Sequence, residues 1–298
     1  SQNEIPEYLN EIIFFLGQNY NFIWQNTNQN LLFNGNHINS NVDFDKYLNF
    51  HNYKFKKEGN ESGGYAILKN KNFILSVDLG SSPQKKFSSD YQSGALSFEI
   101  FFNGCKLISN CGYFQNYKHQ LNSISKSTAT HSTLILDNRS SCKMEKDTDG
   151  IFKINEELKI LKKSIVSEKK YWNISGSHDG YLKKYGVIHE RKIEFFLEKN
   201  KFIGTDKLIK KKKFKSSNFE IRFHFIPGVK ITKTQDEKSI LIEIENSGWK
   251  FSCKDHKIDV ETGLYFGKKN SFVENQNIFI SGLTQNENQE IMWELSKI

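Results

Sequence analysis

Alternating apolar and polar residues form short runs along most of the chain, and the clearest run lies at 95–109. In its first half, apolar side chains recur at every second position, which is the period of a half-buried β-strand. Asn103-Gly104 follows and favours a type I′ turn, because both central positions of that turn require a positive φ. Residues 106–109 then return as a second strand. The pattern therefore predicts a β-hairpin.

Similar runs, separated by Gly, Asn and Ser, predict further strands. We expect them at 64–68, 73–78, 132–136, 159–166, 186–197, 219–225, 240–244, 249–253, 278–281 and 291–295. The chain has only three prolines, and no long helical period follows residue 60. These observations predict an all-β fold, an antiparallel β-sandwich.

The first residues follow a different pattern. Apolar side chains near helical spacing predict a short amphipathic helix over 6–17, ended by Gly17. We interpret 1–49 as the end of a preceding helical domain with its connector, and 50–298 as one β-sandwich domain. The start shows no signal peptide. No apolar run reaches the roughly 18 residues that cross a bilayer, so we expect no transmembrane segment.

The formal net charge is +8, yet only three of the 42 basic residues are arginines: Arg139, Arg191 and Arg222. Proteins that read nucleic acid favour Arg, whose planar fork contacts bases and phosphates bidentately. We therefore expect no nucleic-acid partner. The lysine run at 207–215 is typical of solvated strand edges that block aggregation, with a polyanion-binding patch as the alternative. The four cysteines form no CxxC pair, so we expect free thiols.

Several segments together resemble one known family. Ser-Gly-Gly-Tyr at 62–65 precedes Val-Asp-Leu-Gly at 77–80, Leu-Ser-Phe-Glu ends the segment 91–99, and Ala-Thr-His-Ser-Thr-Leu occupies 129–134. The later segments 185–191 and 221–227 follow in the same register. In order and spacing they resemble the C-terminal domain of the heparinase II/III family, over nearly all of the chain.

The resemblance implies a polysaccharide lyase with an N-terminal α/α toroid and a C-terminal antiparallel β-sandwich. Such an enzyme cleaves acidic polysaccharide by β-elimination, which needs a base, a group that neutralises the uronate carboxylate, and an acid for the leaving oxygen. The resemblance places most of these groups on the toroid. We therefore expect this chain to form the sandwich wall of the cleft, to pack on its own N-terminal helical domain, and to be inactive by itself. It also implies a periplasmic or cell-envelope location.

The same resemblance selects the candidate site residues. His131 is the predicted site histidine, with a structural histidine as the alternative. Tyr91 could stack on a sugar or donate a proton and Gln92 could bond a carboxylate or hydroxyl, although a packed loop is the alternative for both. Asn110 and Tyr65 are predicted to bind substrate. We interpret four other polar residues as fold residues: His189, His224, Asp78 and Glu99.

This sequence departs from the family at its metal site. Members with a metal carry a His-x-His-x-Asp-like stretch where 90–94 here reads Asp-Tyr-Gln-Ser-Gly, and Asn110 stands where they have an aspartate. Zinc takes His, Cys or carboxylate ligands, and only His131 remains. We therefore predict no cofactor, with zinc as the less favoured possibility.

Two other functions remain open beside the lyase module. One is a non-catalytic carbohydrate-binding or cell-envelope protein that kept the fold after losing the metal and histidine residues. The other is a purely structural sandwich without a glycan ligand. A toroid with Asn, His and Tyr at its cleft, encoded upstream, would favour the lyase.

Overall fold

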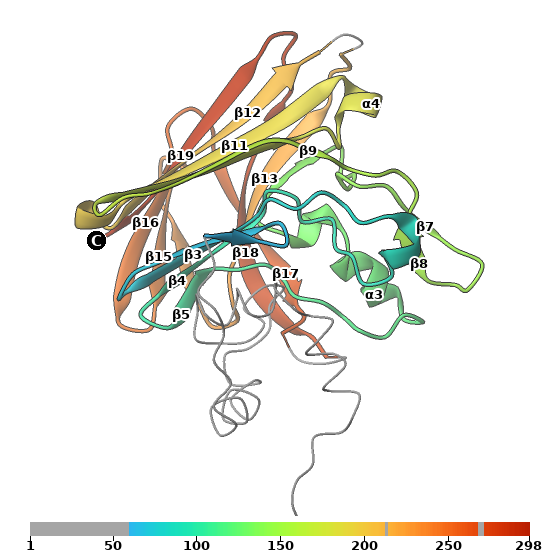
Figure 1. Cartoon of the computed structure of the whole chain (residues 1–298). Helices are drawn as coiled ribbons and strands as arrows, with labels where there is room; N and C mark the ends of the chain where they lie inside the picture. The colour runs from blue at the N-terminus through green and yellow to red at the C-terminus, as the bar shows by residue number, and fades with distance from the viewer. Residues whose placement is uncertain (1–59, 212–213, 268–270) are drawn as a thin grey trace, which may run out of the picture.

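The computed structural model of the chain describes residues 60–211, 214–267 and 271–298 (Figure 1). The predicted helix at 6–17 and the predicted domain boundary near residue 50 lie outside these residues. The named strands all pair antiparallel, which confirms the predicted fold class. Within the described ranges, no helix is long and apolar enough to cross a membrane.

A five-stranded sheet opens the fold, in the order β1-β2-β3-β4-β5. Its strands are β1 (Glu61–Ser62), β2 (Tyr65–Lys69), β3 (Phe73–Asp78), β4 (Phe98–Phe102) and β5 (Cys105–Ile108). The predicted hairpin is β4–β5, and its turn residues Asn103 and Gly104 have φ values of 49° and 88°. The positive φ values match the predicted type I′ turn.

An eight-stranded sheet forms the largest layer, in the order β14-β15-β16-β19-β12-β11-β10-β9. Its strands are β9 (Ile160–Ser167), β10 (Tyr171–His178), β11 (Val187–Phe196), β12 (Lys201–Lys210), β14 (Lys230–Lys233), β15 (Ser239–Ile244), β16 (Ser247–Cys253) and β19 (Gln289–Lys297). Lys207 and Lys210 lie on β12, an interior strand, so this part of the lysine run is not at a sheet edge as predicted.

Smaller elements complete the fold. A four-stranded sheet has the order β17-β18-β13-β6, and β7 pairs with β8. Their bounds are β6 (Leu134–Leu136), β7 (Met144–Lys146), β8 (Phe152–Ile154), β13 (Asn218–His224), β17 (Ile258–Tyr265) and β18 (Val273–Leu283). The helices are η3 (Lys85–Phe87), α3 (Gln120–Ser125), η4 (Thr128–Thr130), α4 (Leu182–Tyr185) and η5 (Leu197–Lys199).

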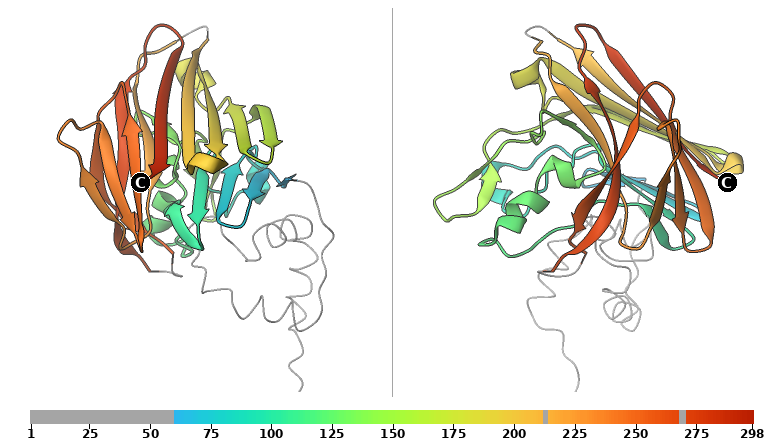
Figure 2. Two further views of the ribbon diagram at one scale, coloured as in Figure 1. Left: turned by 90° about the vertical axis from the view of Figure 1, so that its left-hand side faces the viewer. Right: turned by 180° about the vertical axis from the view of Figure 1, so that it is seen from behind.

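The five- and four-stranded sheets face the eight-stranded sheet (Figures 1 and 2). Aromatic rings pack between them. Phe73 of β3 packs against Phe195 of β11, with ring centroids 4.6 Å apart. Trp293 of β19 stacks on Phe98 of β4 at 5.4 Å and meets Phe223 of β13 at 4.9 Å. Rings of this size contribute most of the apolar area that holds two sheets together. The hairpin β7–β8 and helix α3 lie at one end of this sandwich (Figure 1).

Several predicted strands differ in extent from the observed ones. The strand predicted from 95 begins at Phe98, because Leu96 has a φ of 60° and belongs to the preceding turn. The polar face of β4 is not solvated: Glu99 is fully buried, with an ion pair of 3.1 Å to Lys106. The sequence did not lead us to seven strands: β1, β7, β8, β10, β12, β14 and β17.

Candidate functional site

Two loops hold most of the predicted site residues, one before β4 and one before β6. They are tied together by main-chain and hydroxyl contacts. Ser93 N donates to Lys126 O over 2.9 Å, and the Thr128 hydroxyl donates to Ser93 O over 2.7 Å. A third contact passes through Gly94, where an added Cβ would lie 2.6 Å from Cδ2 of His131. The absence of a side chain at Gly94 is therefore what lets the His131 ring sit against this loop.

His131 lies just after η4, and its side chain is only 2% exposed. Its Nδ1 lies 2.8 Å from Ser127 O. Because a carbonyl only accepts, this contact places the proton of the neutral ring on Nδ1 and leaves Nε2 as the acceptor. Burial lowers the pKa of His131 to about 4, so the ring is neutral near pH 7. With so little exposed area, the ring offers almost no surface to a sugar in this arrangement.

Asn110 lies beside His131 in the same buried layer. Its Oδ1 accepts from Ser132 N over 2.8 Å, and its own main-chain N–H donates to the Glu99 carboxylate over 2.9 Å. The residue is fully buried, so in this arrangement its amide organises the loop before β6 and offers no surface to a substrate. Contact between Asn110 and a polysaccharide stays a prediction.

Tyr91 and Gln92 lie in the loop before β4 and are partly exposed as residues. The Tyr91 hydroxyl and the Gln92 Oε1 are both buried, and neither has a hydrogen-bond partner among the described residues. Burial raises the pKa of Tyr91 well above its ordinary value, with smaller contributions from the nearby Cys142, Asp78 and Tyr65 groups. Tyr91 is thus a protonated phenol, capable of donating a proton but not of accepting one.

Tyr65 lies at the start of β2. It is directly opposite Asp78 in the β2–β3 pairing. Burial raises the pKa of Asp78 to about 7, and an N–H donated by Gly80 over 2.9 Å opposes this rise. Burial and the Asp78 charge also raise the pKa of Tyr65. Tyr65 and Tyr91 thus both lie near Asp78, while Asn110 bonds the residue that follows His131.

The donor set for a metal is poor. Among the residues that the structure describes, no three His, Cys, Asp or Glu side chains lie close enough to share an ion. The ring of His131 also occupies the space beside Gly94 where an aspartate of the family pattern would begin. These residues do not fit the zinc site that the resemblance implies. All four cysteines are free thiols, as predicted.

A buried ionic network supports the two loops from the eight-stranded sheet. Arg191 on β11 forms a bidentate pair with Asp206 on β12, with Nε–Oδ1 2.7 Å and Nη2–Oδ2 3.1 Å. Its Nη1 donates to Leu96 O over 3.0 Å and to Ser132 O over 2.7 Å. Asp206 also accepts from Trp293 over 3.0 Å. One guanidinium thus fixes the turn before β4 and the residue after His131.

His189 and His224, which we interpreted as fold residues, are both buried and contact other polar side chains. His189 Nε2 lies 2.7 Å from Asp206 Oδ1, and its Nδ1 lies 3.1 Å from Nε2 of His178. His224 Nδ1 lies 3.1 Å from the Cys111 sulfur. Burial lowers the pKa of His224 to about 3 and keeps its ring neutral.

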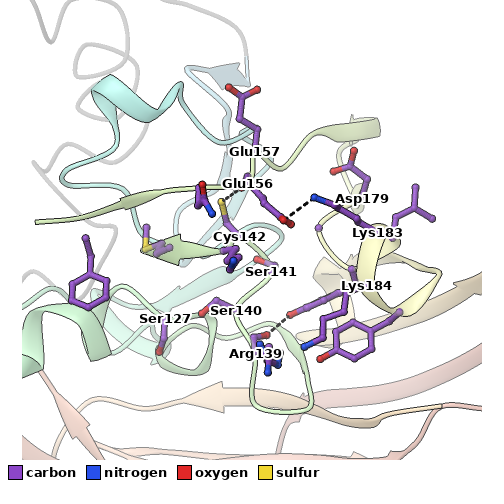
Figure 3. Close-up of a pocket in the computed structure, with 18 of the residues that line it drawn as sticks. Ser127, Arg139, Ser140, Ser141, Cys142, Glu156, Glu157, Asp179, Lys183 and Lys184 are labelled. Atoms are coloured by element: carbon purple, nitrogen blue, oxygen red, sulfur yellow. Dashed lines mark hydrogen bonds and ion pairs between the residues drawn. The ribbon is translucent and has the colours of Figure 1, made fainter. Parts of the chain in front are cut away.

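A pocket of about 730 Å³ lies next to this loop pair. Ser127, whose carbonyl contacts His131, is one of its wall residues. Figure 3 shows Glu156 and Glu157 toward the top of the view and Arg139 toward the bottom. None of the five predicted site residues lines this pocket. Sequence reasoning missed these wall residues, since they come from separate loops and α4 and form no motif.

Comparison with solved structures shows the same fold in heparinases. The chain is 14% identical to the heparan sulfate lyase HepC from Pedobacter heparinus, with a TM-score of 0.69. The match covers 90% of this chain and 44% of HepC. It is 17% identical to the heparinase III product of the BT4657 gene, with a TM-score of 0.69, and the match covers 100% of this chain and 48% of that one. A further heparinase III structure is 15% identical, with a TM-score of 0.66, and the match covers 97% of this chain and 47% of that one. The chain thus spans less than half the length of these structures.

No curated protein matches the sequence. The sequence profile described as heparinase II/III-like, C-terminal, does match, over residues 57–294. That range includes every strand except the last residues of β19. It also includes all five predicted site residues. The chain therefore belongs to the heparinase II/III-like C-terminal family.

Proposed function

We propose that the protein containing this chain is a polysaccharide lyase that cleaves uronate-containing polysaccharide by β-elimination, with this β-sandwich as one wall of the cleft. The observation on which the proposal rests is the family match over 57–294. The solved structures of this fold include a heparan sulfate lyase and two heparinases III. The activity of the whole protein and the identity of its polymer are inferred from that likeness.

The two loops supply polar groups suited to part of such a reaction. Tyr91, held protonated by burial, could pass its proton to the leaving glycosidic oxygen. The unpartnered Gln92 Oε1 could accept a hydrogen bond from a sugar hydroxyl. We assign His131 to positioning the loop at 90–94, because its ring lies under Gly94 and its Nδ1 holds Ser127. The base and the group that neutralises the carboxylate would come from a helical domain packed on this one.

The proposed substrate also suggests where the protein works. Acidic polysaccharides are polymers of the cell exterior, so we propose a periplasmic or cell-envelope location. The proposed substrate-binding residues are Tyr65, which lies opposite Asp78, and Asn110, which is buried. Both would need the adjoining domain or a loop movement to bring a sugar to them.

The test is an activity screen of the full-length gene product on a panel of uronic-acid polysaccharides, following the absorbance of the unsaturated product. We expect turnover of at least one polymer, and none by the 298-residue chain alone. Tyr91→Phe should lower the rate by about 10²-fold or more if Tyr91 donates the proton. His256→Ala, at a partly buried histidine outside both loops, is the matched control for His131→Ala.

A pH profile separates a positioning role from proton transfer. If His131 positions the loop, His131→Ala should lower activity without moving the limbs of the profile, whereas loss of a general base would remove a limb. Turnover by the isolated chain would refute the divided cleft. A folded His131→Ala variant with wild-type rate would leave His131 as a structural residue only.

A second candidate function is non-catalytic binding of a glycan. The occupied space beside Gly94 and the scarcity of metal-binding side chains among the described residues support this alternative. Binding of a uronate polymer by the full-length protein without any unsaturated product would support this alternative against the lyase.

A further inference from the structure

The pocket of about 730 Å³ beside Ser127 contains two cations without carboxylate partners. Arg139, from the loop after β6, and Lys184, from α4, both line it and are exposed. In the described parts of the chain neither forms an ion pair, whereas their neighbour Lys183 pairs with Glu156 at 2.8 Å. Unpaired cations on a concave wall are the basic requirement of a site for an anion.

Two lysines after β12 add positive charge near α4. Lys211 N donates to Gly186 O over 2.7 Å and Lys215 N to Tyr185 O over 2.9 Å. Burial, followed by the charges of Arg139 and Lys215, lowers the pKa of Lys184. The Lys143 charge acts in the same direction, and the Asp137 charge opposes it. The charges that shift the pKa of Lys184 are therefore mainly positive.

The opposite wall of the pocket is acidic (Figure 3). Glu156 is neutralised by Lys183, but Glu157 is exposed and forms no ion pair in the part of the chain that the structure describes. Asp179 accepts the Lys159 N–H through Oδ1 over 2.8 Å, which leaves its other oxygen available. Carboxylates of this kind accept hydrogen bonds from hydroxyl groups.

The two walls select a ligand with an anion on one side and hydroxyls on the other. A carboxylate suits the planar fork of Arg139, which can donate two parallel hydrogen bonds to it. Nucleic acid or polyphosphate, with anions throughout, would meet Glu157 and Asp179. A neutral sugar would leave Arg139 and Lys184 unpaired. The volume falls within the roughly 300–1,000 Å³ of known small-ligand pockets and is sufficient for a sugar ring.

We propose that this pocket binds one carboxylate-bearing sugar unit of the polysaccharide, with the carboxylate at Arg139 and Lys184 and the hydroxyls at Glu157 and Asp179. The inference rests on the proposed function, since that supplies the acidic polymer. It adds a site outside the two loops of predicted residues. Ser127 links the two places, because it lines the pocket and holds His131 Nδ1.

The test measures binding by titration calorimetry of the full-length protein with oligomers of galacturonate, glucuronate and alginate. Arg139→Ala/Lys184→Ala is compared with Lys250→Ala/Lys254→Ala, which removes the same charge from exposed lysines on and after β16. The pocket variant should bind the best oligomer about tenfold more weakly or worse, and the control variant should bind as the wild type does. The methyl ester of that oligomer should bind the wild type at least as weakly as the free acid binds the pocket variant.

Thermal unfolding of each variant verifies the fold, and Arg139→Lys, which keeps the charge but loses the fork, gives a milder second variant. Equal losses in both double variants, equal binding of the methyl ester, or no binding of any oligomer would each overturn the site. Turnover is recorded separately. Binding without turnover would support the pocket and refute the lyase activity. Turnover with an unchanged KM in the pocket variant would refute the pocket alone.

Discussion

Asp206→Asn should be the most informative single change in the sandwich, because it removes one charge without changing the shape of the side chain. The Asp206 carboxylate is fully buried and accepts four hydrogen bonds, from His189, from Arg191 twice, and from Trp293. An asparagine keeps one oxygen and replaces the other with an NH₂ group, which cannot accept. At least two buried donors then lose their acceptor, and the Arg191 guanidinium loses its counter-charge.

The magnitude follows from these losses. Leaving a buried donor unsatisfied costs about 1–3 kcal/mol, so two of them account for roughly 2–6 kcal/mol. Breaking a buried ion pair by removing one partner costs about 3–5 kcal/mol in other proteins, which agrees with this range. We therefore expect the free energy of unfolding to fall by about 3–5 kcal/mol. Asp259→Asn is the matched control, since its pair with Lys233 at 3.1 Å is partly exposed and should contribute below about 1 kcal/mol.

Equilibrium denaturation in urea, followed by tryptophan fluorescence and circular dichroism, measures both variants. A second substitution, Arg191→Met, should cost less in the Asp206→Asn background than alone, because the guanidinium it removes is already unpaired there. A loss for Asp206→Asn no larger than that of the Asp259→Asn control would refute the reasoning. So would strict additivity of the two substitutions at these contacting residues.

Three further outcomes follow from the loops and the thiols. Gly94→Ala should lower the free energy of unfolding by about 1–3 kcal/mol, because the added Cβ would meet the His131 ring. The loss should be smaller in a His131→Ala background, and equal losses in both backgrounds would contradict the contact. Elemental analysis of purified protein should find no stoichiometric zinc, and one equivalent that disappears with His131→Ala would show otherwise. Burial raises the pKa of all four thiols, to about 11 for Cys105 and to about 12 for Cys142, but only Cys105 is partly exposed, so only Cys105 should react with iodoacetamide at a measurable rate before unfolding; rapid alkylation of Cys142 in folded protein would indicate that the pocket wall opens.

Local patterns in the sequence were enough to predict the fold class and many of its strands. The period of two in β4 and the Asn103-Gly104 turn act over a few neighbouring residues, so they can be read without knowing what the strands pack against. Strands with weaker alternation were missed. On β12, Lys207 and Lys210 resemble residues of an exposed edge strand, but β12 lies inside the sheet. Lysines are tolerated on its solvent face, because their stems cover apolar surface and their charges can pair there, as Lys207 does with Glu290 at 2.8 Å.

The site was decided by tertiary contacts that no local pattern contains. The family resemblance selected His131, but only the packing shows its ring buried against Gly94. That contact joins two residues that lie 37 positions apart in the sequence. The Arg191–Asp206 pair and the pocket around Arg139 and Lys184 likewise join separate strands, loops and α4. Charge and burial at such places depend on distance in space, so the sequence determined the sandwich, and the folded chain determined which polar groups are buried, paired or left facing the pocket.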